Sequence, residues 1–92
     1  MKHKNMLADF LKTRRVSAGL SQKDVADKLG YSTPQFISNW ERGVSQPPIN
    51  ILKKLGEMYK VPAEELFEVT LNTTIFDVTQ DLRRKFANSK SR

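Results

Sequence analysis

Ninety-two residues with 16 Lys and Arg against 10 Asp and Glu carry a net charge of +6, which favours a polyanionic partner. This length corresponds to one small domain, and a chain without cysteine forms neither disulfides nor thiolate metal sites. No stretch reaches the roughly twenty apolar residues that span a bilayer, and the N-terminus lacks the apolar run of a signal peptide, so we expect a cytoplasmic protein without a membrane partner.

A first helix is predicted near the N-terminus. Leu7, Phe10 and Leu11 follow the i, i+3, i+4 spacing of one helical face. The helix is expected to end near Ala18 and Gly19, because glycine commonly follows the last turn of a helix. Its apolar face should pack into the core.

A second helix is predicted over about residues 21–29. Ser21 can accept a hydrogen bond from a backbone N–H one turn later, and Gly30 tolerates the left-handed backbone that ends a helix. Apolar residues at helical spacing lie between these ends: Val25, Ala26 and Leu29.

A third helix is predicted over about residues 34–42, separated from the second by a turn. Thr33 is its expected cap, Pro34 can stand first because its missing N–H costs nothing there, and Gly43 ends it. Its large apolar side chains are expected in the core: Phe36, Ile37 and Trp40. For Phe36, the alternative is contact with a thymine methyl.

The other face of this third helix is polar and suited to recognition. Gln35 and Asn39 stand at i and i+4 and therefore point the same way, with Ser38 and Arg42 beside them. An amide side chain carries a donor next to an acceptor, which matches the N6 and N7 edge of adenine in the major groove. Two short helices separated by a turn are the arrangement that places such a face on DNA.

A fourth and a short fifth helix are predicted after a loop over residues 44–48. The apolar positions of the fourth follow helical spacing: Ile51, Leu52, Leu55, Met58 and Tyr59. The fifth has Pro62 in its first turn, and Glu64 and Glu65 are placed favourably against the positive end of its dipole.

A series of residues recurs at the offsets of one known family. They are Leu20-Ser21-Gln22, Val25-Ala26, Leu29-Gly30, Ile37-Ser38, Trp40-Glu41-Arg42-Gly43, and then Pro47, Ile49, Leu52, Leu55, Tyr59, Val61 and Glu65-Leu66. Through them, about residues 7–67 resemble the lambda-repressor-like helix-turn-helix family of transcriptional regulators, also called the xenobiotic-response-element type. The resemblance implies an all-α, five-helix DNA-binding domain over residues 1–67, followed by a C-terminal extension. It also implies a sequence-specific regulator of double-stranded DNA, which we expect to be a dimeric repressor at an operator.

The resemblance also suggests roles for individual residues. The expected base contacts are Gln35, Ser38 and Asn39. The expected phosphate contacts are Gln22, Thr33, Arg42, Ser45 and Gln46. Arg15 and Glu41 match a structural ion pair that fastens the first helix to the end of the recognition helix.

The sequence departs from the family pattern at three places. The stretch from Gly30 to Ile37 is longer than the common form by a single residue, so the turn before the recognition helix is enlarged. Arg14 stands where the family has an apolar core residue, and we expect its charged head to reach solvent. Lys60 stands where the family has a glycine that ends helix four, at a cost of up to about 1 kcal/mol if left-handed.

Residues 68–92 lie beyond the resemblance and are expected to mediate dimerisation or bind a partner. Partial alternation over residues 68–74 predicts a strand or an extended connection. Thr73 or Thr74 would then cap a sixth helix, whose apolar side chains share one side: Ile75, Val78, Leu82 and Phe86. This helix either folds back on the domain or pairs with a second chain; we favour pairing, because such proteins usually bind two half-sites as dimers.

Enzymatic chemistry has little support in the sequence. There is one histidine, His3, with no cysteine, and no Gly-rich phosphate loop is formed by the four glycines. We therefore expect no catalytic residue, no cofactor and no metal site. Two alternatives stay open: an antitoxin that regulates its own gene and neutralises a toxin, and an adaptor that no longer meets DNA.

Overall fold

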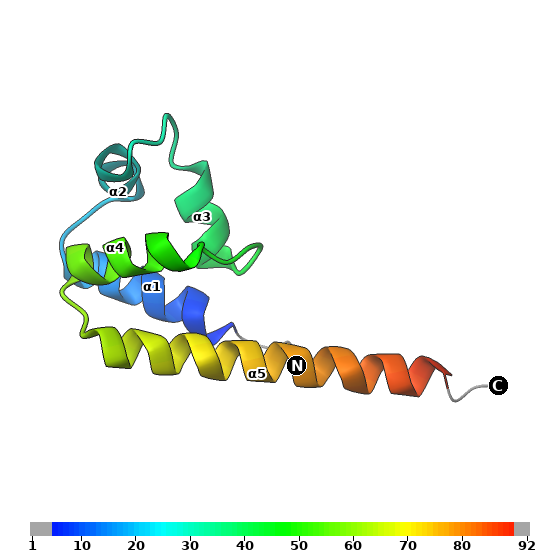
Figure 1. Cartoon of the computed structure of the whole chain (residues 1–92). Coiled ribbons are helices and arrows are strands. Elements are labelled where there is room, and N and C mark those ends of the chain that lie inside the picture. Colours follow the sequence, from blue (N-terminus) through cyan, green and yellow to red (C-terminus); the bar gives the residue numbers. More distant parts are fainter. Residues whose placement is uncertain (1–4, 90–92) are drawn as a thin grey trace.

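The computed structural model describes residues 5–89, which form helices and, within that range, no strand (Figure 1). The helices are α1 (Met6–Ser17), α2 (Gln22–Leu29), α3 (Gln35–Arg42), α4 (Ile49–Tyr59) and α5 (Ala63–Ser89). The predicted all-α class is confirmed, and each helix of the central pair begins within a residue of its predicted start. His3 lies outside the described residues.

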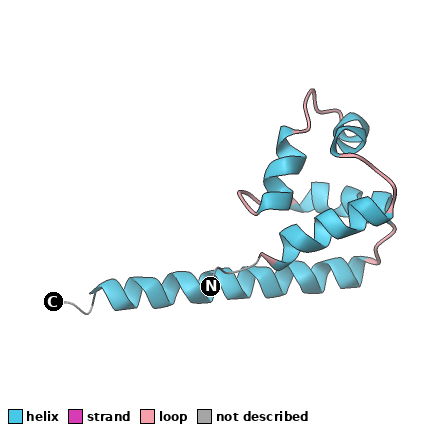
Figure 2. Ribbon diagram, turned by 180° about the vertical axis from the view of Figure 1, so that it is seen from behind, coloured by secondary structure: helices cyan, strands magenta, loops and turns pink. Residues whose placement is uncertain are grey.

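The core lies where α1, α3, α4 and α5 meet, with α2 packed against α3. Its largest fully buried apolar side chains are Val25, from α2, Ile37 and Leu55. Trp40 is only 4% exposed, as the helical periodicity predicted. Helix α5 runs along one side of this core, and its C-terminal half projects beyond the other helices (Figures 1 and 2).

The ends of α2 and the turn after it are fixed by local hydrogen bonds. The Ser21 hydroxyl accepts from the Asp24 amide, and the Asp24 carboxylate accepts from the Ser21 amide, each at 2.9 Å. These reciprocal bonds form a capping box. Gly30 ends the helix with a left-handed backbone at φ 86°, and the Thr33 hydroxyl accepts a hydrogen bond from the Gln35 amide at 3.2 Å.

The enlarged turn before α3 changes the position of one predicted core residue. Tyr31 lies in this turn and packs its ring against Phe36, with 5.0 Å between centroids, and against the edge of Trp40 at 6.1 Å. Phe36 itself is 53% exposed, so its expected place in the core is wrong. Phe36 also contacts Trp40, with 6.3 Å between ring centroids, so the three aromatic side chains form one cluster with Phe36 at its exposed side.

The C-terminal segment is a single helix, which corrects the prediction for residues 68–74. No strand, extended connection or second cap interrupts α5 between Ala63 and Ser89. Tertiary contacts outweigh the β preference of this stretch. Val69 packs against the core, and Thr73 is fully buried. The Thr73 hydroxyl accepts a hydrogen bond from the Leu7 amide at 3.0 Å, so it satisfies the N-terminus of α1 instead of beginning a new helix.

Two departures from the family pattern are accommodated as expected. The Arg14 guanidinium lies 5.2 Å from the centroid of the Phe10 ring and pairs with Glu65 at 2.8 Å, with 38% of its side chain exposed. Lys60 ends α4 in a left-handed conformation, at φ 58° and ψ 46°. Across residues 5–89 it is the one residue other than glycine with a positive φ.

Over the same range, none of the helices combines the length and the apolar character needed to cross a membrane.

Candidate nucleic-acid interface

A buried ion pair supports the recognition helix from behind. Arg15 Nε lies 2.7 Å from Glu41 Oε2, and Arg15 Nη2 donates to Glu41 Oε1 at 3.0 Å. Their side chains are 10% and 3% exposed. Because the guanidinium also donates to the Leu20 carbonyl at 2.7 Å, the pair joins the end of α1 to the end of α3 and to the segment before α2.

The contacts of this pair shift the pKa values of Arg15 and of the nearby Tyr59. The hydrogen bond to Glu41 raises the pKa of Arg15 above its ordinary value. Burial, and then the Glu41 charge, raise the pKa of the Tyr59 hydroxyl, which therefore stays neutral beside the carboxylate. The ion pair therefore acts as a structural anchor.

Gln22 is attached to the same anchor. Its side-chain amide donates to Glu41 Oε1 at 3.0 Å, and the residue is half-buried at the start of α2. An amide nitrogen carries a second N–H that this bond does not use. Gln22 is therefore held in a fixed position, with donor capacity left for a phosphate oxygen.

The polar side chains on the outer side of α3 form one hydrogen-bonded surface, which we call the reading face: Gln35, Ser38, Asn39 and Arg42. The Asn39 carbonyl oxygen accepts from Gln35 Nε2 at 3.0 Å and from Arg42 Nη2 at 2.7 Å. Arg42 Nε also donates to the Ser38 hydroxyl at 3.3 Å. The structure thus brings the three expected base contacts together with one expected phosphate contact.

The remaining expected phosphate contacts lie apart from the reading face. Thr33 is exposed in the turn before α3, where its hydroxyl already accepts from the Gln35 amide. Ser45 and Gln46 are exposed in the loop after α3 and line a polar hollow of about 200 Å³ together with Asn5 and Asp77. Because these two residues lie in the loop after α3, outside the hydrogen-bonded surface of that helix, they have the weakest geometric support.

Phe36 also lies at this surface, although it is not among the expected base contacts. It belongs to the first turn of α3, one position after Gln35, and its ring is 53% exposed. The one signal in the sequence was its place next to the polar face, which suggested contact with a thymine methyl as an alternative to burial. Its exposure now favours that alternative.

The described part of the chain contains no group of three or more His, Cys, Asp and Glu side chains arranged to hold a metal ion. The chemistry available at the surface of α3 is hydrogen bonding by amides, a hydroxyl and a guanidinium, together with one exposed aromatic ring. Groups of this kind recognise base edges and phosphates.

Comparison with known proteins gives consistent matches. Residues 11–66 match the model of a family described as helix-turn-helix. The HTH-type transcriptional regulator ImmR of Bacillus subtilis (strain 168) is 35% identical over 87 residues, which cover 84% of this chain and 68% of ImmR. The cryptic phage CTXphi transcriptional repressor RstR of Vibrio cholerae is 30% identical over 61 residues, covering 66% of this chain and 54% of RstR.

A third similar protein is the uncharacterized HTH-type transcriptional regulator Rv0474 of Mycobacterium tuberculosis (strain ATCC 25618 / H37Rv). It is 31% identical over 58 residues, which cover 63% of this chain and 41% of that regulator. The matched part of this chain therefore spans about two fifths of that regulator's length.

Proposed function

This chain belongs to the helix-turn-helix family of transcriptional regulators, and from this membership we infer that it acts by binding DNA. We propose that it binds double-stranded DNA in a sequence-specific manner, with α3 in the major groove, and represses transcription by occupying an operator. The observation that carries the proposal is the reading face, in which four polar side chains lie together on the outer side of a rigidly supported helix. One similar protein, RstR, is named a transcriptional repressor.

In this proposal Gln35, Ser38 and Asn39 read base edges. Binding replaces the hydrogen bonds among these side chains by bonds to bases, so the amides exchange one set of partners for another. An Asn or Gln that meets adenine uses both its donor and its acceptor. Phe36 adds apolar contact at the same edge of the helix.

Phosphate contacts provide register and most of the salt-dependent affinity. We assign them to Arg42 on the reading face, to Gln22 and Thr33 outside it, and with less geometric support to Ser45 and Gln46. The net charge of +6 adds long-range attraction to the duplex.

We further propose that the protein acts as a dimer in the cytoplasm and that the segment over residues 68–92 mediates pairing. Helix-turn-helix proteins that read pseudo-palindromic operators place two recognition helices about 34–36 Å apart, which requires two copies. The C-terminal half of α5 projects from the body and exposes apolar side chains suited to such pairing (Figure 1).

The test is selection from a randomised duplex pool with the purified chain at about 150 mM salt, followed by sequencing of the retained DNA. The proposal expects enrichment of an inverted repeat whose half-sites lie about one helical turn apart. Enrichment of a single half-site would support base reading and remove the dimer. A pool that remains random would overturn the proposed function.

A further inference from the structure

Helix α5 carries a long apolar surface that no other helix covers. Six of its side chains are between 38% and 73% exposed, and we call them the stripe: Phe67, Leu71, Ile75, Val78, Leu82 and Phe86. At about 3.6 residues per turn, the stripe lies roughly opposite the fully buried Thr73, on the side turned away from α1. A contiguous exposed apolar surface of this length is typical of a protein interface.

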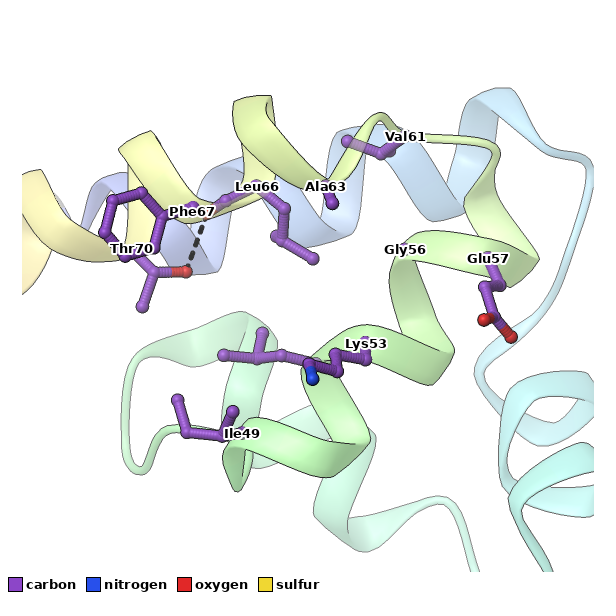
Figure 3. Close-up of a pocket in the computed structure, with 10 residues that line it drawn as sticks. Ile49, Lys53, Gly56, Glu57, Val61, Ala63, Leu66, Phe67 and Thr70 are labelled. Atoms are coloured by element: carbon purple, nitrogen blue, oxygen red, sulfur yellow. Dashed lines mark hydrogen bonds between the residues drawn. The ribbon is translucent and has the colours of Figure 1, made fainter.

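The stripe begins beside further apolar surface on the body. A pocket of about 450 Å³ lies between α4 and α5, and Phe67 is part of its lining (Figure 3). Ile49, at the start of α4, lines the same pocket and is 64% exposed. The exposed apolar surface is therefore broader at the N-terminal end of the stripe, where Ile49 adds to Phe67, than at the projecting end.

The order of side chains in the stripe is nearly the same in both directions. Its two phenylalanines are equidistant from the midpoint between residues 76 and 77, and so are its two leucines. The two β-branched residues, Ile75 and Val78, stand on either side of that midpoint. A reversed copy of α5 would therefore meet this one with Phe at the level of Phe, Leu at the level of Leu and Ile at the level of Val.

The charges of α5 select the same orientation. Glu68 lies at the edge of the stripe in the N-terminal part of α5, and Lys85 lies at the edge of the stripe near its C-terminal end, where it also pairs with Asp81 of the same helix at 3.0 Å. Glu68 and Lys85 are equidistant from the midpoint that organises the stripe. Antiparallel helices would place opposite charges at the same level, whereas parallel helices would place like charges together, which is destabilising.

We propose that a second copy of this chain covers the stripe, with the two α5 helices antiparallel about a twofold axis that passes beside residues 76 and 77. Such a contact is isologous, because each residue and its counterpart exchange roles between the two copies. The projecting half of each α5 then lies along the half that carries the body of the other copy. This inference deepens the dimer of the proposed function and rests on it.

The lack of cysteine in the chain allows a direct test of orientation with single-cysteine variants. We would prepare Leu71→Cys and Leu82→Cys, confirm helicity by circular dichroism, and add a thiol crosslinker with a reach of about 8 Å. In the antiparallel pair, Cys at 71 lies level with Cys at 82 of the other copy, while two copies of either position are about 16 Å apart along the axis, from 1.5 Å per residue. Mixing the two variants should therefore give a crosslinked dimer that neither variant gives alone.

A charge exchange tests the register independently. Glu68→Lys and Lys85→Glu should each weaken self-association by about three- to tenfold, as measured by sedimentation equilibrium. Each substitution places two like charges opposite each other, at position 68 of one copy and position 85 of the other. The double variant E68K/K85E should recover the wild-type constant. Arg84→Glu makes the same charge change as Lys85→Glu and also breaks a pair with Asp81, but on the side of α5 away from the stripe. It serves as the matched control, with an association constant close to wild type.

The outcomes separate this inference from the proposed function. Crosslinking of either cysteine variant to itself, or a double variant that stays weak, would overturn the antiparallel pairing while leaving a dimer. A chain that remains monomeric yet selects a DNA sequence would overturn the pairing and the dimer but leave base reading in place.

Discussion

The backbone amide of Leu7 donates a hydrogen bond to the hydroxyl of Thr73, at 3.0 Å and across 66 residues of sequence. Leu7 belongs to the first turn of α1, where backbone N–H groups have no partner within the helix. Asn5 caps the neighbouring Ala8 amide at 2.9 Å, so a local and a distant side chain share the same helix end. Both Leu7 and Thr73 are buried, which makes their bond a stability determinant of the whole fold.

Replacing Thr73 by Val should lower the free energy of unfolding by about 1–3 kcal/mol. The substitution keeps the shape of the side chain but leaves the Leu7 amide buried without an acceptor. Urea denaturation followed by circular dichroism measures the change. Thr73→Ser keeps the hydroxyl and should lose less; a Val variant as stable as wild type would show that the bond is unimportant.

Removing Glu41 should be the most destabilising single change near α3. Glu41→Ala leaves the buried Arg15 guanidinium without its carboxylate, at an expected cost of about 3–5 kcal/mol. The matched control is Asp27→Ala, which breaks an exposed pair with Lys23 and should cost about 1 kcal/mol at most. The unfolding temperatures of the two variants should therefore differ clearly. Equal losses of stability would argue against a structural role of the Arg15–Glu41 pair.

Replacing Asn39 by Ala should remove about 1–3 kcal/mol of discrimination at one base step of the selected operator. Asn39 joins the other polar side chains of α3 through its carbonyl oxygen, so its loss also releases Gln35 and Arg42. Binding assays on single-base variants of the operator measure the effect. Equal weakening on operator and random DNA would contradict the base-reading role.

Gln22→Ala provides the contrasting control for Asn39→Ala. Gln22 lies off the reading face and is fixed by Glu41, so its loss should weaken binding to all sequences and leave the base preference unchanged. A selective loss at one operator position would show that Gln22 reads a base.

The stability of α2 should depend on pH below about 4. Hydrogen bonds with the Ser21 amide and hydroxyl lower the pKa of Asp24 below its ordinary value. A carboxyl whose pKa is lowered by folding stabilises the fold above its unfolded pKa of about 3.9, and this contribution is lost as pH falls through the folded pKa. Wild type and Asp24→Asn should therefore differ in stability at pH 7 and converge in acid, as unfolding curves at a series of pH values would show.

Lys60→Gly should raise stability by up to about 1 kcal/mol, because glycine adopts the left-handed backbone of this position without a Cβ penalty. The converse change, Gly30→Ala, should destabilise through the backbone alone. Gly30 has φ 86° and no atom within 4 Å of an added Cβ. Chemical denaturation of both variants measures the pair of opposite effects, and a loss of stability in Lys60→Gly would contradict the expectation.

The parts of the fold that could be predicted are those set by near neighbours in sequence. Ser21 and Gly30 end α2 through bonds to residues within a few positions, and the burial of Trp40 follows from helical spacing. The continuity of α5 could not be predicted, since the hydroxyl of Thr73 finds its partner at the other end of the sequence. The local sequence around a threonine is the same whether its hydroxyl caps its own helix or a distant one.

The candidate site shows the same division. The grouping of Gln35 and Asn39 follows from their i, i+4 spacing alone. The exposure of Phe36 and its contact with Tyr31 of the enlarged turn are matters of tertiary packing, which a helical pattern does not contain. The acidic neighbour of Ser45 and Gln46 comes from α5, in a segment that sequence patterns did not place beside them.

Helix α1 is tied at its two ends to different partners: its first turn to α5 through Thr73, and its last turn to α3 through Glu41. Its 12 residues therefore form a strut of about 18 Å, from 1.5 Å per residue. Through these two contacts, α1 links the position of α5 to that of α3. In a dimer held together by α5, this link would fix the distance between the two α3 helices. An operator with one base pair added at its centre should then bind more weakly.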